Sequence, residues 1–160
     1  YLGKDLRNAC LCLCLCHDGT MSEDKRSIEL TRIAPNHYRA TAPNGASIEF
    51  GRGEGLMTPV ELLLAAVAGC SSIDVDTVTS RHTDAERFDV RASADKIVED
   101  GANRLENVHL DFDLAFPDDE AGRRADAQIE KLVGLSHDKY CTVSRTVEHA
   151  TPVSYSVRRD

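Results

Sequence analysis

The feature that most constrains the fold is a long apolar run that begins at Thr58 and ends near Ser80. Thr58 is a competent N-cap, Pro59 suits the first helical position, and Glu61 follows the cap by three residues, so a helix is predicted to start here. The run VELLLAAVAGCSSIDVDTV is apolar on almost every face until Ser71, which is typical of a buried helix. Its polar interruptions argue against a membrane span. We therefore expect a helix at the centre of the molecule.

Strand patterns flank this helix on both sides. The segment before it predicts three short strands joined by tight Pro-Asn and Asn-Gly turns, and the segment after it predicts a hairpin of two longer, alternating strands. A further helix, a last helix from Ser136 and a closing edge strand follow. The expected ranges are 27–33, 37–41, 47–50, 88–99 and 104–116 for the strands, 117–134 for the additional helix and 153–157 for the edge strand. This order predicts an α+β fold with antiparallel sheets packed around the buried helix.

Length and charge limit the partners. The chain has 160 residues and a formal net charge of −8, with 27 acidic against 19 basic side chains. This length suits one domain, which we place at 21–160. Binding to nucleic acid or to an acidic membrane needs a concentrated basic patch, and the sequence has only the short pairs Arg123-Arg124 and Arg158-Arg159. We expect neither a nucleic-acid partner nor a membrane partner.

Residues 1–20 differ from the rest of the chain. Leucine and cysteine alternate from Cys10 to Cys16, and Met21 then opens an ordinary polar segment, so we take Met21 as the natural start. The segment lacks the basic flank, unbroken apolar stretch and cleavage site of a signal peptide. We expect a non-native or disordered extension. A short added strand and a soft-metal site are the alternatives, although CxCxC spacing without a second cluster is a weak metal signature.

Two cysteines remain in the body of the chain, Cys70 and Cys141. In an acidic chain without a secretion signal, which we expect in the cytoplasm, they are either buried apolar fillers or a redox pair. Cys70 lies on the apolar helix and shares a face with Asp74 and Thr77, a polar stripe that suggests a site. Cys141 is expected in the second turn of its helix, where the helix N-terminus and Arg145 favour a thiolate. The histidines show no shared spacing, so no metal or cofactor is expected.

At these residues the sequence resembles a known family. TPVELLLAAVAGCSSIDV and LSHDKYCTVSRTV resemble the two signature segments of the OsmC/Ohr hydroperoxide-reductase family, most closely its YhfA-like branch, over Ser27 to Val157. The resemblance implies an α+β fold and an intertwined homodimer with active sites at the subunit interface. It also implies an organic hydroperoxide substrate and an unknown dithiol reductant. By the same resemblance, Cys70 attacks the peroxide and Cys141 resolves the sulfenic acid as a disulfide.

The sequence departs from the family at the residues that assist the thiolate. The resemblance calls for a glutamate ten residues before the first cysteine, where this chain has Val60 with Glu61 next to it. It also calls for an early arginine, whose position aligns with His37, two residues before Arg39. On a regular helix Glu61 lies on the side opposite Cys70. Glu61 and Arg39 are nevertheless the candidates for these two roles.

The candidate catalytic residues are therefore Cys70, Cys141, Glu61 and Arg39. Local electrostatics favour Cys141 as the attacked sulfur, because Asp74 should raise the pKa of Cys70. We assign the attack to Cys70, since a dimer can bring an arginine to it, with Arg39 and Arg52 as candidates. The alternative function is a non-enzymatic binding or thiol-sensor protein with an apolar cavity at the subunit interface. A metal-binding protein acting through the cysteine-rich start is a third reading.

Overall fold

The computed structural model describes residues 25–159, so the expectations for residues 1–20 lie outside the described residues. The chain divides into two compact units, Tyr1–Met57 and Thr58–Asp160. The sequence led us to expect one domain over 21–160. The division falls between Met57 and Thr58, the residue that caps the apolar helix.

The first unit is a three-stranded antiparallel sheet in the order β1-β2-β3. Its strands are β1 (Glu29–Ala34), β2 (His37–Thr41) and β3 (Ser47–Gly51), close to the expected ranges 27–33, 37–41 and 47–50. Asn36 closes the first turn with a φ of 58°, and Gly45 closes the second with a φ of 86°. These are residue types that tolerate positive φ, which explains why both connections can be tight.

The second unit begins with α1 (Pro59–Thr79), and its start is the predicted one. The Thr58 hydroxyl accepts a hydrogen bond from the Glu61 N–H at 3.3 Å, and Glu61 Oε2 accepts one from the Thr58 N–H at 2.6 Å. This reciprocal pair is a capping box. It satisfies two backbone donors that a helix start would otherwise leave unpaired.

Burial of α1 is confined to one stripe. Val67, Ser71, Val75 and Thr79 are the buried residues, spaced four apart on one face. The expectation of a helix buried on every side therefore holds for this face only, because Ile73, for example, keeps 51% of its surface exposed. By length and composition alone α1 could cross a membrane, contrary to our expectation. The core helix of a soluble protein can have the same length and composition, so this is weak evidence.

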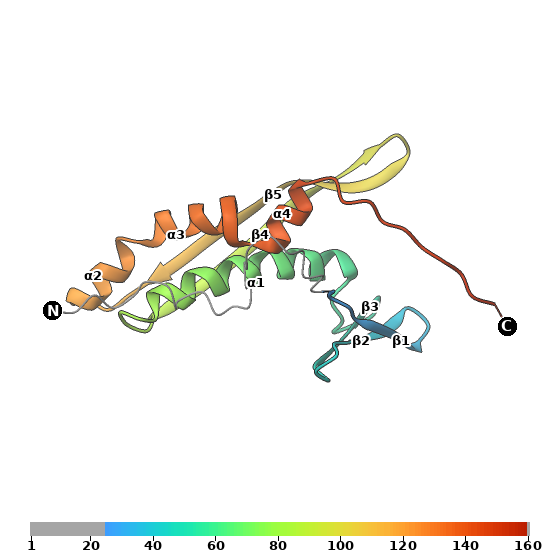
Figure 1. Cartoon of the computed structure of the whole chain (residues 1–160), viewed down its shortest axis with the longest axis horizontal. Helices are drawn as coiled ribbons and strands as arrows, with labels where there is room; N and C mark the ends of the chain where they lie inside the picture. The colour runs from blue at the N-terminus through green and yellow to red at the C-terminus, as the bar shows by residue number, and fades with distance from the viewer. Residues whose placement is uncertain (1–24, 160) are drawn as a thin grey trace. The chain divides into compact units, whose positions relative to one another are not determined.

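A long antiparallel hairpin of β4 (Arg87–Glu99) and β5 (Ala102–Ala115) runs beside α1, with β4 in contact with the helix (Figure 1). The pairing register shifts between Ser93 and Asp95. Asn107 lies opposite this irregularity with a φ of 53°, and its side-chain amide donates to Asp95 Oδ2 at 2.9 Å. The hairpin confirms the α+β prediction.

The helical segment that follows is more broken than predicted. The single helix expected over 117–134 is two helices, α2 (Glu120–Asp126) and α3 (Ile129–Leu135). Asp119 caps α2 by accepting the Gly122 N–H at 2.7 Å, so the helical segment starts two residues after Pro117. A Cβ at position 122 would lie 1.8 Å from the Pro117 carbonyl oxygen, and glycine is therefore required at this start.

The helix expected to run from Ser136 through Cys141 is also divided. Its first part is a π-helical turn, η1 (Ser136–Tyr140), and its second is α4 (Thr142–Glu148). Cys141 stands between them in an extended conformation, with φ −70° and ψ 97°, and serves as the N-cap of α4. The prediction that Cys141 lies within a continuous helix is wrong.

The predicted edge strand at 153–157 does not form in the described residues, which have no regular secondary structure from 150 to 159. Val153 and Tyr155 are each 93% exposed. The alternating pattern is compatible with a strand, but a strand also needs a neighbour to pair with, and no neighbour is present for this segment in the described protomer.

Candidate functional site

The fold brings the two predicted cysteines together. Cys70 lies on α1 and is partly exposed, whereas Cys141 lies between η1 and α4 and is fully buried. Both are free thiols, and Cys141 is close enough to Cys70 to raise the pKa of its thiol. Residues 71 positions apart in the sequence thus form a pair of neighbouring thiols, which are not bonded as a disulfide.

The π turn positions Cys141. The Cys141 N–H donates to the Ser136 carbonyl at 2.8 Å, which is the closing bond of the turn. Ser136 is itself 1% exposed, and its hydroxyl donates to Asp74 Oδ2 on α1 at 2.7 Å. The segment that carries Cys141 is therefore tied to the helix that carries Cys70, one turn beyond that cysteine.

Hydrogen-bond donors surround the Cys141 sulfur. Ser144 donates to it twice, from its backbone N–H at 3.3 Å and from its hydroxyl at 3.1 Å. The Ser71 side chain on α1 also lowers the pKa of this thiol. Burial by itself raises the pKa of Cys141, but the hydrogen bonds from Ser144, Ser71 and Cys70 outweigh it, and the net shift is downward. A thiolate is favoured at this sulfur because each donor stabilises the charged form.

Arg145 does not supply the positive charge that the sequence suggested for Cys141. Its guanidinium donates from Nη1 to the Asp138 carbonyl at 2.9 Å, and Nη2 lies 3.3 Å from His149 Nε2. It braces the π turn against α4. The lowered pKa of Cys141 comes from neutral donors, chiefly Ser144.

Cys70 has the opposite electrostatics. Burial raises the pKa of its thiol, the backbone N–H of Val143 opposes that rise, and Cys141 and then Asp74 raise it further. The upward effect of Asp74 agrees in direction with the sequence argument, although burial and Cys141 contribute more. Thr77, the other member of the predicted polar stripe, donates to the Ile73 carbonyl at 2.6 Å on its own helix.

The two auxiliary candidates have other partners. Glu61 is held in the capping box with Thr58, whose N–H lowers the pKa of the carboxyl group. Arg39 lies in the first unit, where its Nη2 is 2.6 Å from Glu49 Oε1, and His37 Nε2 is 2.8 Å from the other oxygen of the same carboxylate. Arg39 and then His37 lower the pKa of Glu49.

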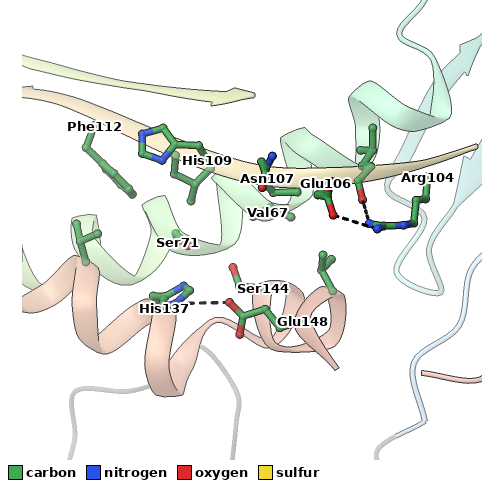
Figure 2. Close-up of a pocket in the computed structure, with 15 residues that line it drawn as sticks. Val67, Ser71, Arg104, Glu106, Asn107, His109, Phe112, His137, Ser144 and Glu148 are labelled. Carbon is green, nitrogen blue, oxygen red and sulfur yellow. Dashed lines mark hydrogen bonds and ion pairs between the residues drawn. The ribbon is translucent and has the colours of Figure 1, made fainter. Parts of the chain in front are cut away.

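A pocket of about 500 Å³ adjoins the sulfur pair. Its wall includes Ser144, which donates to the Cys141 sulfur, and Ser71, which lowers the pKa of the same thiol. The rest of the wall consists of apolar side chains and of polar side chains from β5, η1 and α4 (Figure 2). The apolar members are Val67, Leu105, Val108, Leu110, Phe112, Val133 and Val147, and the polar ones are Arg104, Glu106, Asn107, His109, His137 and Glu148.

Sequence reasoning missed much of this wall. His137 and His109 showed no shared spacing, yet both line the pocket, and His137 Nε2 lies 3.4 Å from Glu148 Oε1. Ser71 was detectable, because it falls on the one buried stripe of α1, four residues after Val67. In the described part of the chain, no group of three or more His, Cys, Asp or Glu side chains could hold a metal ion.

With this geometry known, comparison with other proteins identifies the family. The model of the OsmC-like proteins matches residues 51–156, which include both cysteines. The chain belongs to the OsmC-like family. The YhfA protein of Escherichia coli K12 is 28% identical over 105 residues, which are 65% of this chain and 74% of YhfA. This agrees with the branch to which the cysteine motifs pointed.

Solved structures of OsmC-like proteins share the fold. An OsmC-like protein from Vibrio cholerae aligns with a TM-score of 0.59 at 15% identity, over 78% of this chain and 94% of that one. The organic hydroperoxide resistance protein OhrB of Bacillus subtilis aligns with a TM-score of 0.50 at 17% identity, over 76% and 90%. A hypothetical protein from Aquifex aeolicus reaches 0.63 at 21% identity, over 78% and 88%. At these identities the comparison establishes the α+β fold alone.

Proposed function

We propose that this OsmC-like protein reduces organic hydroperoxides through the Cys70 and Cys141 pair, in a cytoplasmic response to oxidative stress. The observation that carries the proposal is the sulfur pair itself, two free thiols that elements far apart in the chain bring close together. Sulfurs this close can convert a sulfenic acid on one into a disulfide with the other. The name of the Bacillus subtilis OhrB protein supports hydroperoxide as the substrate class.

The difference in exposure between the two cysteines supports the proposed order of the reaction. Cys70 is partly exposed and Cys141 is 0% exposed, so a peroxide meets Cys70 first. Cys70 attacks the outer peroxide oxygen and becomes a sulfenic acid, and Cys141 then displaces the hydroxyl group to form a disulfide. An external dithiol restores both thiols by exchange. The neighbouring pocket, with its apolar side chains, suits the organic part of the hydroperoxide.

Residue-resolved oxidation tests this assignment. The cysteines fall in separate tryptic peptides, because trypsin cuts after Arg52 and Arg81 around Cys70 and after Lys139 and Arg145 around Cys141. With an organic hydroperoxide and a sulfenic-acid trap, Cys141→Ser should accumulate the adduct on Cys70. Cys70→Ser should show little reaction on Cys141. The reverse pattern would transfer the attack to Cys141.

The exposed apolar residues of α1 support a homodimer. Val60, Leu63 and Ile73 keep 47%, 40% and 51% of their surfaces exposed in one protomer, and a second copy could cover this helix. We propose a symmetric dimer on that basis. Sedimentation should show a dimer at micromolar concentration, and Ile73→Lys should shift it toward monomer. A stable wild-type monomer would contradict the dimer without affecting the thiol assignment.

A non-enzymatic thiol sensor is the second candidate. Two observations favour it. Burial and the Cys141 sulfur raise the pKa of Cys70, so less of this thiol is present as thiolate. Glu61 is engaged in the helix cap and does not assist the thiol. Turnover separates the two functions. Sustained peroxide consumption with a dithiol reductant supports the enzyme, whereas a single oxidation that the dithiol does not reverse on the time scale of peroxide loss supports the sensor.

A further inference from the structure

The wall of the pocket beside the two cysteines carries more negative than positive charge. Among the described residues, its charged side chains are one cation, Arg104, and two carboxylates, Glu106 and Glu148. The other members of the wall are apolar side chains, two histidines, two serines and an asparagine. The chain as a whole has a formal net charge of −8, which is of the same sign. An anionic group that enters this cavity is therefore repelled by its surroundings.

The guanidinium of Arg104 already has partners for its charge. Its Nε donates to Glu99 Oε2 at 2.8 Å, and its Nη2 donates to Glu99 Oε1 at 3.1 Å and to Glu106 Oε1 at 3.0 Å. Its Nη1 donates to the Leu105 carbonyl at 3.4 Å. Two carboxylates thus share one guanidinium. A bound anion would have to displace one of them to form the paired contact that arginine makes with a carboxylate.

The second carboxylate of the wall lies on the other side of the cavity. Figure 2 shows Arg104 and Glu106 turned toward one another on the β5 side, and Glu148 beside His137 on the side of η1 and α4. Ser144, which donates to the Cys141 sulfur, precedes Glu148 by four residues on α4, or about one helical turn. A molecule whose peroxide group reaches the thiols therefore lies close to a carboxylate of the wall.

We propose that the pocket selects uncharged organic hydroperoxides and disfavours those that carry a carboxylate. The inference rests on the proposed reduction of hydroperoxides by Cys70 and Cys141, and it narrows the substrate class. Apolar side chains such as Phe112 and Val67 can cover the hydrocarbon part of the molecule. The carboxylates oppose the entry of a like charge, so the selection acts on kcat/KM.

A matched pair of substrates tests this selectivity. The para-carboxylate of cumene hydroperoxide and its methyl ester have nearly the same shape and differ by one charge. With dithiothreitol as the dithiol, kcat/KM should be about tenfold lower for the carboxylate than for the ester, because a field of like charge slows entry. The assay is run at about pH 8, where a histidine of ordinary pKa is neutral. The reaction of each peroxide with dithiothreitol alone corrects for intrinsic reactivity.

Salt and two conservative variants identify the charges. Raising the sodium chloride concentration from about 0.02 M to about 0.5 M should bring the carboxylate toward the ester, because salt screens the repulsion. Glu106→Gln and Glu148→Gln each remove one negative charge from the wall, and each should raise the carboxylate-to-ester ratio of kcat/KM by about threefold. Glu130→Gln is the matched control. Glu130 is exposed on α3 and is not in the wall, so the same change in net charge should leave the ratio at its wild-type value.

Each outcome has one interpretation. A carboxylate that reacts more slowly than its ester, with a ratio that rises with salt and in both pocket variants, supports selection by charge. Equal kcat/KM for the two, a preference for the carboxylate, or a ratio that neither salt nor the variants change overturns it. Equal values are also expected if a second copy of the chain fills the pocket. In all these cases the reduction of hydroperoxides by the thiols stands, whereas an absence of Cys70 oxidation with both cumene hydroperoxide and the ester refutes the proposed function itself.

Discussion

The helix that carries Cys70 and the segment that carries Cys141 are built in different ways. Helix α1 is one regular element of 21 residues, closed at its start by a capping box. The segment from α3 to α4 is divided by a π turn, and Cys141 has an extended backbone at the break. Cys70 is thus positioned by a regular helix, whereas Cys141 is positioned by a break between two helical segments.

The interruption gives Cys141 its donors. An N-cap side chain accepts from a backbone N–H that the first turn of a helix leaves unpaired, and here Cys141 accepts from Ser144 in that way. Within α1 most N–H groups are already bonded to carbonyls, so Cys70 has only the Val143 N–H of the other segment as an opposing donor. The difference in pKa direction between the sulfurs follows from this difference in backbone.

The strongest test of the comparison acts on the buried stripe that joins the two regions. Val75 is 0% exposed, and Val75→Ala should reduce the free energy of unfolding by about 2 kcal/mol, since two methyl groups are lost and a cavity remains. Val98→Ala is the matched control, because Val98 on β4 is 70% exposed and should cost under about 0.5 kcal/mol. Denaturant unfolding at one protein concentration measures both. Equal losses would show that the stripe is not the structural core.

The next test breaks the bond between α1 and the π turn. Asp74→Ala and Ser136→Ala should each destabilise the fold by about 1.5 to 3 kcal/mol, the usual range for a hydrogen bond to a charged group. The double variant should lose less than the sum of the two. It should also form the Cys70 to Cys141 disulfide more slowly, because the turn no longer holds Cys141 in place.

Asp76→Ala serves as the control for this cycle. Asp76 lies on the same helix two residues further on and is exposed, so its removal should leave stability and disulfide formation close to wild type. Strict additivity of Asp74→Ala and Ser136→Ala would mean that the hydrogen bond contributes no coupling between the regions.

The sequence predicted the elements whose pattern is local. The capping box at Thr58, strand β2 and the long hairpin after α1 follow from caps, alternation and turn residues within a few positions. The division of the last helix was not predictable in this way. Its causes are contacts between distant segments, such as the bond of Ser136 to Asp74, and no periodicity within 136–148 contains that information. The predicted strand at 153–157 failed for the same reason, since pairing is not local.

The same distinction applies to the site. The motifs pointed to Cys70 and Cys141, which the fold brings near each other. Arg145 was predicted to stabilise the Cys141 thiolate, but Ser144 supplies the hydrogen bonds, because a charged residue is visible in a sequence and the geometry of a helix cap is not. Ser71 entered the site through its place on the buried stripe of α1. For Glu61 the sequence did indicate the role in the helix cap, and the hydrogen bond to Thr58 in that cap keeps its carboxylate from assisting the thiol.

The smallest expected effect is the pH dependence of stability, and it sharpens the comparison because the two sulfurs have opposite signs. Cys141 has a folded pKa below its ordinary value of 9.0, chiefly through Ser144 working against burial, so it contributes stability that is present above 9.0 and lost as the pH falls through the folded value. Cys70 has a folded pKa above 9.0, chiefly through burial, so its contribution is present below 9.0 and lost as the pH rises through the folded value.

These signs predict how two serine variants depart from the wild type. The stability advantage of the wild type over Cys141→Ser should grow with pH from below the folded pKa of Cys141 up to 9.0. The difference in stability between the wild type and Cys70→Ser should instead be constant below pH 9.0. Above pH 9.0 the wild type should lose stability relative to this variant. Subtraction between variants cancels the other groups that titrate in this range. Because the two thiols interact, the apparent pKa values belong to the pair. If the curves of stability against pH were parallel for the two variants, the backbone difference between the two regions would not affect the pKa values of the two thiols.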